Sequence, residues 1–264
     1  MGTLETPIAL TNTLNVGLVH DALVEYTLSH CASNGVRVTS INPVVCECND
    51  SSLNMIEERA VTKEHVFKAI ESAGSVFELG DVGCGKGTTC HGLKGGVGTA
   101  SRVFDIGGRR FTVGVLMQTN HGRLGDLRID GKDVGTALSR VLDENLPDKG
   151  SCITVVGTDL PLSSRQLRRV LKRASVGLVR NGSYLGHGSG DIFVGFTTAN
   201  RLWADKKPIR QLEIIDEEQL DTAFRACAEA TEEAVLSSML NARKTTGFSG
   251  KVRCSLKDML KYTE

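Results

Sequence analysis

The sequence lacks an excess of charge of either sign. Its 264 residues include 31 Lys and Arg and 31 Asp and Glu, so the formal net charge is zero. Binding to a nucleic acid or to an anionic membrane surface usually requires a basic excess. We therefore expect neither nucleic acid nor a membrane as a partner. The charged fraction of 23% and the apolar fraction of 40% are ordinary for a soluble globular protein.

A long hydrophobic run and a secretion signal are also absent. Residues 1–6 contain no basic start and no apolar core. No apolar run reaches the roughly 20 residues that a membrane-spanning helix needs. We therefore expect a cytoplasmic protein. Proline is scarce, with 5 residues, whereas glycine is abundant, with 29. The glycines cluster between Gly80 and Gly98, which indicates a specialised backbone there rather than disorder.

The eight cysteines form no familiar disulfide or metal-binding pattern. The spacings Cys46-x-Cys48 and Cys84-x5-Cys90 are not those of zinc knuckles, and no paired histidines follow at the usual interval. A chain of this length does not need disulfides to be stable. We therefore expect free buried thiols, no metal ligands and no cofactor.

Hydrophobic periodicity predicts a single domain over residues 1–264, in which strands and helices are mixed. The expected helices cover residues 16–29, 62–73, 163–180 and 216–242. The expected strands cover residues 36–46, 152–157 and 192–198, with a hairpin over residues 101–120 that turns at Gly107-Gly108 and a short strand pair around Asp130-Gly131. Such a mixture favours a layered α/β sandwich.

The most informative feature is the Gly150-Ser151 pair, which opens a β-branched, apolar run. If the chain is cleaved between these two residues, Ser151 gains a free α-amine beside its hydroxyl and carries both nucleophile and base. Such an amine has a pKa of about 7.7–8.0, which suits a base near neutral pH. Glycine would also allow the backbone angles that the attack requires. Taken alone, the pair is more typical of a plain turn before a strand.

A second cluster, Gly188-Ser189-Gly190-Asp191, opens another apolar run. Residues two apart in an extended segment point to the same side, so Ser189 and Asp191 could face Ser151 together. A polar turn with a capping aspartate is the alternative. His187 would complete a Ser-His-Asp triad, but a histidine at a surface turn is the commoner interpretation.

Ordered motifs run along nearly the whole chain. They are Leu10-Thr11-Asn12-Thr13 with Val16-Gly17, Asn42-Pro43-Val44-Val45-Cys46-Glu47-Cys48-Asn49-Asp50 with Leu53-Asn54, Gly92-Leu93-Lys94-Gly95-Gly96-Val97-Gly98-Thr99-Ala100-Ser101-Arg102, Val113-Gly114-Val115-Leu116-Met117-Gln118-Thr119-Asn120, Gly150-Ser151, Thr158-Asp159-Leu160-Pro161-Leu162, Arg165-Gln166-Leu167 and Gly188-Ser189-Gly190-Asp191. As a set they resemble the self-cleaving serine aminopeptidases, which include the L-aminopeptidase/D-esterases and the β-peptidyl aminopeptidases.

The resemblance implies two central β-sheets flanked by helices, an N-terminal-nucleophile-like sandwich with its own strand order. It also implies self-cleavage between Gly150 and Ser151, followed by hydrolysis of short peptides, amides or esters through an acyl-enzyme on Ser151. Ser189 and Asp191 would assist this nucleophile, and Asn120 would stabilise the oxyanion. The family further suggests a homo-oligomer.

Glu47 follows the expected strand that ends at Cys46. An aminopeptidase needs an anion to hold the ammonium group of its small substrates, and a carboxylate at a pocket rim would serve. A solvated carboxylate at a strand end is an equally good interpretation. Family members carry a substantial segment upstream of the Leu10-Thr11-Asn12-Thr13 region, whereas this sequence starts at Met1. We therefore expect an N-terminally truncated chain.

Other functions stay open. A truncated family member that folds without catalysing is one, and acyl transfer to an amine by a similarly folded enzyme is another. Residues 80–86 match the start of a phosphate loop, but Gly87 stands where that motif requires Ser or Thr. We interpret this segment as a loop that lines the catalytic cleft. The basic run at residues 165–173 is interpreted as a solvated helix face.

Overall fold

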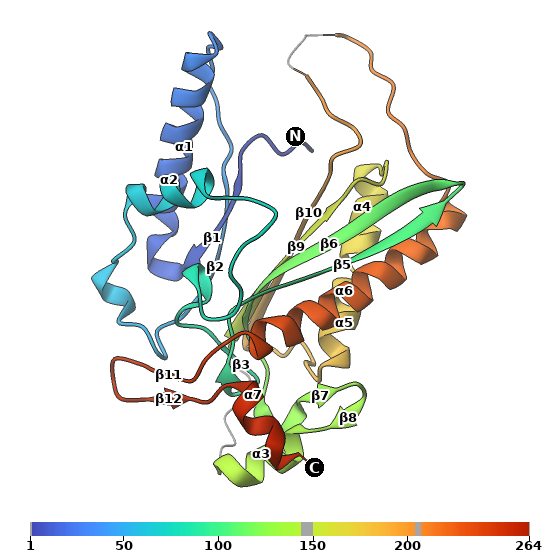
Figure 1. Cartoon of the computed structure of the whole chain (residues 1–264). Helices are drawn as coiled ribbons and strands as arrows, with labels where there is room; N and C mark the ends of the chain where they lie inside the picture. Colours follow the sequence, from blue (N-terminus) through green and yellow to red (C-terminus); the bar gives the residue numbers. More distant parts are fainter. Residues whose placement is uncertain (1, 144–149, 204–206, 264) are drawn as a thin grey trace.

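The computed structural model describes residues 2–143, 150–203 and 207–263. Four layers follow one another across the molecule (Figure 1): three helices, a four-stranded sheet, a two-stranded sheet and a pair of helices. This arrangement confirms the predicted layered α/β sandwich with two central sheets flanked by helices.

The larger sheet has the strand order β10-β9-β6-β5. Its strands are β5 (Val97–Ile106), β6 (Arg109–Asn120), β9 (Gly150–Thr158) and β10 (Ser189–Thr197). The β5–β6 and β6–β9 pairs are antiparallel, whereas β9 and β10 run parallel. Because the parallel strands β9 and β10 start at the same end of the sheet, the two Gly/Ser clusters singled out in the sequence become neighbours there.

The predicted hairpin over residues 101–120 is present as β5 and β6. Gly107 and Gly108 form its turn, with φ angles of 57° and 77°. A two-residue turn with positive φ at both positions matches the right-handed twist of the flanking strands, which explains why two glycines stand there.

One face of the larger sheet is covered by α4 (Ser164–Leu171), α5 (Ala174–Arg180) and α6 (Leu220–Leu240). The prediction of a single helix over residues 163–180 is wrong, because the chain forms two helices that are separated near Lys172. The second of them comes very close to α6, since a Cβ at Gly177 would lie 2.5 Å from the carbonyl oxygen of Ala228.

The other face of the larger sheet packs on a small parallel sheet of β1 (Ile8–Asn12) and β2 (Val44–Cys48). The helices α1 (Val16–Ser33) and α2 (Lys63–Glu71) cover the outer side of this small sheet. Both helices were predicted. The strand predicted over residues 36–46 starts only at Val44, directly after a proline that cannot donate to a sheet ladder.

Short elements complete the described chain. They are β3 (Thr89–Cys90), β4 (Leu93–Lys94), β7 (Arg128–Ile129), β8 (Lys132–Asp133), α3 (Gly135–Leu142), β11 (Thr245–Thr246), β12 (Val252–Arg253) and α7 (Leu256–Met259), with 3-10 turns at Thr13–Asn15, Ile56–Glu58, Gly83–Gly85, Leu124–Asp126, Glu217–Gln219 and Leu260–Tyr262. The strand pair predicted around Asp130-Gly131 is β7 and β8. The sequence did not predict α3.

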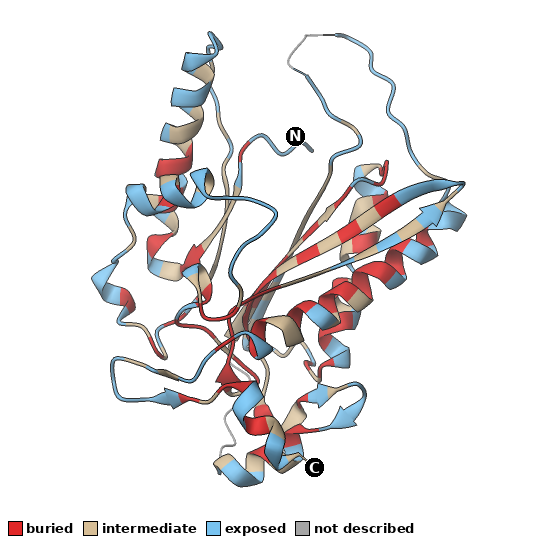
Figure 2. Cartoon of the chain, in the orientation of Figure 1, coloured by how far each residue is buried: buried red, intermediate tan, exposed pale blue. Residues whose placement is uncertain are grey.

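The main core lies between the larger sheet and α6 (Figure 2). A second, smaller core joins α1, α2 and the small sheet. Among the residues that the structure describes, no helix combines the length and the apolarity needed to cross a bilayer.

Candidate active site

Ser151 lies at the start of β9, between Asn120 on β6 and Gly190 on β10. Residues paired in register share a face of the sheet, so the side chains of Ser151 and Asn120 point the same way, toward β2. A Cβ at Gly190 would stand 3.6 Å from the Cβ of Ser151, in ordinary contact. The absence of a side chain at Gly190 therefore leaves space on that side of the serine.

The thiol of Cys48 on β2 approaches the same serine, with its Sγ 3.5 Å from the carbonyl oxygen of Ser151. Burial raises the pKa of Cys48 to about 12. The thiol is therefore neutral near neutral pH and can donate to this carbonyl, but it does not compete with Ser151 as a nucleophile.

The Asn120 side chain is buried and its orientation is set by two hydrogen bonds. Its Nδ2 donates to the carbonyl oxygen of Asn49 at 2.9 Å, and its Oδ1 accepts from the backbone N–H of Thr89 at 3.0 Å. A carboxamide nitrogen carries two hydrogens, so one N–H of Asn120 is left over from these two bonds. The geometry therefore holds a donor rigidly beside Ser151, as an oxyanion site requires.

Ser189 and Asp191 point to one side, as predicted, and the Ser189 hydroxyl donates to Asp191 Oδ1 at 2.9 Å. The face differs from the expected one. The register sets Asp191 against Cys152 and Gly190 against Ser151, and the Cys152 thiol contacts Asp191 Oδ1 at 3.2 Å. Since side chains alternate along a strand, Ser189 and Asp191 lie on the face opposite to the Ser151 hydroxyl.

Gly150, on the amino side of Ser151, has no room for a side chain. A Cβ there would stand 1.9 Å from the carbonyl oxygen of Asn120, and the Gly150 N–H donates to the carbonyl of Gly188 at 3.1 Å. Gly150 is not among the residues with positive φ. Close approach of a neighbouring strand, rather than unusual backbone angles, is thus what requires glycine at this position.

The structure does not bring Glu47 or His187 against Ser151. Glu47 is half-buried and accepts a hydrogen bond from the Thr13 hydroxyl. It precedes Cys48 and therefore lies on the other face of β2. His187 is exposed, and no hydrogen bond within the described residues joins it to Ser151 or to Asp191.

Asp50, which the sequence did not single out as a site residue, lines a cavity of about 830 Å³ beside β1, α1 and α2. The side chain is buried and accepts from Asn54 Nδ2 at 3.0 Å, and burial raises the pKa of its carboxyl. The only signal was its place beside Asn49 in the Asn49-Asp50 motif. Asn12 and Asn54 also line the cavity, whereas Ser151 and Asn120 do not.

The glycine-rich loop is organised around the buried ammonium group of Lys94. Its Nζ donates to the carbonyl oxygens of Gly85 (2.8 Å), Thr88 (2.7 Å) and Gly95 (2.7 Å), and burial lowers the pKa of Lys94 to about 8. A phosphate loop presents N–H groups to an anion, whereas these carbonyls converge on a cation. Lys86 points elsewhere, with a side chain 70% exposed. The loop is therefore not a nucleotide site.

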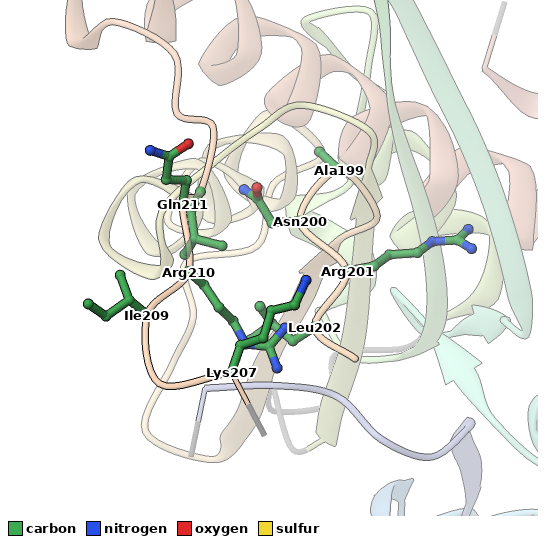
Figure 3. A pocket seen from close by; sticks show the side chains of 9 residues that line it. Ala199, Asn200, Arg201, Leu202, Lys207, Ile209, Arg210 and Gln211 are labelled. Carbon is green, nitrogen blue, oxygen red and sulfur yellow. The ribbon is translucent and has the colours of Figure 1, made fainter. Parts of the chain in front are cut away.

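A second hollow of about 370 Å³ lies on the loop after β10 (Figure 3), lined by residues 199–202, 207 and 209–212. Ser189 stands at the opposite end of the nine-residue strand β10, roughly 26 Å away at about 3.3 Å per residue. This hollow is therefore separate from the residues around Ser151.

The fold brings Cys90 close to two histidines, although the sequence spacing shows no metal-binding pattern. Cys90, His91 and His121 are all buried, and their potential ligand atoms lie within 4.8 Å of one another. The sequence could not reveal the group, because His121 is thirty residues further along the chain and arrives through the fold.

A layered sandwich with a serine at the start of a central strand is characteristic of the N-terminal-nucleophile hydrolase folds, and the comparisons with known proteins agree. A family model described as peptidase family S58 matches residues 1–253. The chain belongs to this family.

Two relatives are named β-peptidyl aminopeptidase BapA. The protein from Sphingosinicella xenopeptidilytica is 38% identical over 91% of this chain and 63% of its own length. The one from Sphingosinicella microcystinivorans is 40% identical over 94% of this chain and 66% of its own length. The chain thus spans about two thirds of the length of these relatives.

Solved structures are similar as well. A Pyrococcus horikoshii protein has a TM-score of 0.91 at 45% identity, over 99% of this chain and 73% of its own. The L-aminopeptidase D-ala-esterase/amidase of Ochrobactrum anthropi, described as a variant of the Ntn hydrolase fold, has a TM-score of 0.87 at 37% identity, over 96% and 71%.

Proposed function

We propose that this protein is a self-processing serine aminopeptidase. Ser151 carries the proposal, since it opens a central strand directly beside a buried carboxamide donor, Asn120, and directly after Gly150. The reaction is metal-independent and needs no cofactor. The substrates are short peptides, amides or esters with a free amino group, like those implied by the names of the related aminopeptidases.

Self-processing begins with attack of the Ser151 Oγ on the carbonyl carbon of Gly150. The C–N bond breaks as the ester forms, and the departing nitrogen takes up the proton that the Ser151 hydroxyl releases and becomes the α-amine of Ser151. Water then hydrolyses the ester and leaves a carboxylate on Gly150. Asn120 donates to the oxyanion of the tetrahedral intermediates.

In turnover, the α-amine of Ser151 accepts the proton from its own hydroxyl, which attacks the substrate carbonyl. The substrate's leaving amine takes this proton, and water releases the acyl group. A backbone nitrogen lies in the plane of its sheet, so the amine can be reached from both faces. Ser189 and Asp191 hold it from the face opposite to the hydroxyl, which gives their observed placement a role.

Glu47 is proposed to bind the ammonium group of the substrate. It is half-buried on β2, one residue before the cysteine that contacts Ser151. Its carboxylate lies on the face of β2 away from Ser151, so this role requires the amino end of the substrate to pass the edge of that strand. We further propose a cytoplasmic location and a homo-oligomeric assembly, which follow from the sequence and from the family resemblance.

The test compares the wild-type chain with Ser151→Ala by intact mass and denaturing electrophoresis. We expect two fragments for the wild type, the second starting at Ser151, and one intact chain for the variant, because alanine has no hydroxyl to start the acyl shift. Cleavage that persists in the variant would contradict the proposal.

Turnover is tested separately with a free-amine p-nitroanilide and its N-acetylated form. Hydrolysis of the first alone supports an aminopeptidase. Equal rates on both would remove that assignment. Transfer of the acyl group to an added amine in preference to water would identify an acyltransferase, and a cleaved chain without turnover an inactive family member.

A further inference from the structure

Three side chains of types that can bind a metal ion meet next to the candidate active site. The thiol of Cys90 and ring nitrogens of His91 and His121 lie within 4.8 Å of one another, and all three residues are buried. Around a tetrahedral zinc ion, ligand atoms stand about 3.5 Å apart, given bonds of about 2.0–2.3 Å. Small side-chain adjustments would therefore bring the three onto one ion.

His121 is the second observation that points to an ion. Its ring is buried, and neither ring nitrogen has a hydrogen-bond partner within the described residues. Buried polar atoms are nearly always satisfied, and leaving one unsatisfied costs about 1–3 kcal/mol. A bound metal ion would give one of these ring nitrogens the partner that it lacks.

His91 is held in an orientation that suits a ligand. Its Nδ1 is 3.0 Å from the carbonyl oxygen of Arg123. Because a carbonyl only accepts, Nδ1 carries the proton and Nε2 presents a lone pair, the usual state of a metal-binding histidine. The backbone of His91 is left-handed, with a φ of 45°. Such a conformation is uncommon for a residue with a side chain and often marks functional sites.

The packing around the His91 ring also holds this ring in one orientation. A Cβ at Gly122 would stand 2.5 Å from ring atoms of His91, so only glycine leaves space for this imidazole. The His91 N–H also donates to the carbonyl of His121 at 2.7 Å. The backbone thus joins the two histidines directly, and their rings meet edge to face with centroids 5.5 Å apart.

The cluster is continuous with the residues around Ser151. Thr89, next to Cys90, donates its N–H to Asn120, which precedes His121. A Cβ at Gly150 would stand 3.2 Å from the Cα of His121. An ion here would connect the turn after β3 to the end of β6 and so fix the backbone on which Asn120 stands.

We propose that Cys90, His91 and His121 bind one zinc-like divalent transition metal ion. A thiolate with two imidazoles is a ligand set that zinc favours, and the fourth position is left to water or another small ligand. The ion holds β3 against β6 and positions Asn120. It takes no part in the proposed chemistry of Ser151.

The test is a Co²⁺ titration of the metal-stripped, full-length Ser151→Ala chain, followed by absorbance. This background separates metal binding from self-cleavage, so either proposal can fail without the other. We expect one equivalent of Co²⁺ to produce a thiolate-to-cobalt charge-transfer band in the near ultraviolet, which Zn²⁺ abolishes by competition. Native mass spectrometry should show one ion per chain, and Zn²⁺ should raise the Tm.

Substitutions identify the ligands. Cys90→Ser should remove the charge-transfer band, and His121→Phe, which fills the same buried space without a nitrogen, should weaken Co²⁺ binding more than about tenfold. The matched control is Cys227→Ala, which replaces another buried thiol outside the cluster and should leave the titration unchanged.

The proposal is overturned if the folded chain gives no cobalt band and no Zn²⁺-dependent rise in Tm. It is equally overturned if the band survives Cys90→Ser. Circular dichroism shows whether each variant folds. If a variant does not fold, the cobalt band and the Tm of the chain with the unsubstituted cluster still decide the outcome.

Discussion

At the scale of single residues, Gly150 is the most constrained position of the candidate site. We predict that Gly150→Ala slows self-cleavage on the order of a hundredfold, because its Cβ would stand 1.9 Å from the Asn120 carbonyl and displacement by about an ångström costs that much. Intact mass measured over time gives the half-time of cleavage.

The control for this prediction is Gly114→Ala. Gly114 lies on the same sheet, but a Cβ there would meet only the Gly157 carbonyl, at 3.9 Å. We expect wild-type cleavage from it. Equal half-times for the two variants would show that the close approach at Gly150 is irrelevant to cleavage.

Two acidic residues, Glu47 and Asp50, are candidates for binding the substrate ammonium group. We predict that Glu47→Gln raises KM for a free-amine substrate about tenfold to a hundredfold at nearly constant kcat, since a hydrogen bond between charged groups contributes about 1.5–3 kcal/mol. Asp50→Asn, which alters the buried carboxyl of the 830 Å³ cavity, should leave KM unchanged. The reverse pattern in steady-state kinetics would assign ammonium binding to Asp50.

At the scale of elements, Lys94 ties the glycine-rich loop to β4. We predict that Lys94→Met lowers the free energy of unfolding at pH 7 by about 1–3 kcal/mol, because it takes a donor from buried carbonyls. The expected measurement is denaturant unfolding followed by circular dichroism. A variant as stable as the wild type would mean that the three bonds contribute nothing net.

The same lysine predicts a pH dependence. Burial lowers its pKa from 10.5 to about 8 in the folded state, so between these values the unfolded chain binds more protons and stability rises with pH. This group adds at most about 3 kcal/mol between pH 8 and pH 10.5. The advantage of the wild type over Lys94→Met should therefore widen in that window. A constant difference would show that the folded-state pKa is ordinary.

Elements with strong local signals were predictable. The β5–β6 turn follows from Gly107-Gly108, and α2 begins at the Thr62 capping box that its sequence indicates. The break near Lys172, within residues 163–180, was not predictable, because the apolar positions continue in helical register across it. The close packing of Gly177 on α6 is a tertiary contact that the local pattern does not show. The face of Ser189 and Asp191 was also missed, since only the pairing of β9 with β10 decides which residue lies beside Ser151.

At the scale of the whole molecule, the proposed cleavage cuts a chain whose two parts share one sheet. β9 of the second part pairs with β6 of the first over eight residue pairs, from Val113↔Thr158 to Asn120↔Ser151. In addition, α6 packs on β5 and β6. We predict that the fragments remain associated and co-elute in size-exclusion chromatography, separating only in denaturant. Separate elution in native buffer would contradict the shared sheet.

The sequence by itself determined the family, the mixed α/β class, the candidate nucleophile and the nature of its neighbours, because these depend on local patterns and ordered motifs. Only the tertiary structure decided which side chains meet. Strand register placed Asn120 beside Ser151 and turned Asp191 to the other face. The path of the chain through β5 and β6 brought His121 next to Cys90 and His91. Contacts between residues far apart in the chain depend on how the sheets and helices pack, and no local pattern encodes that packing.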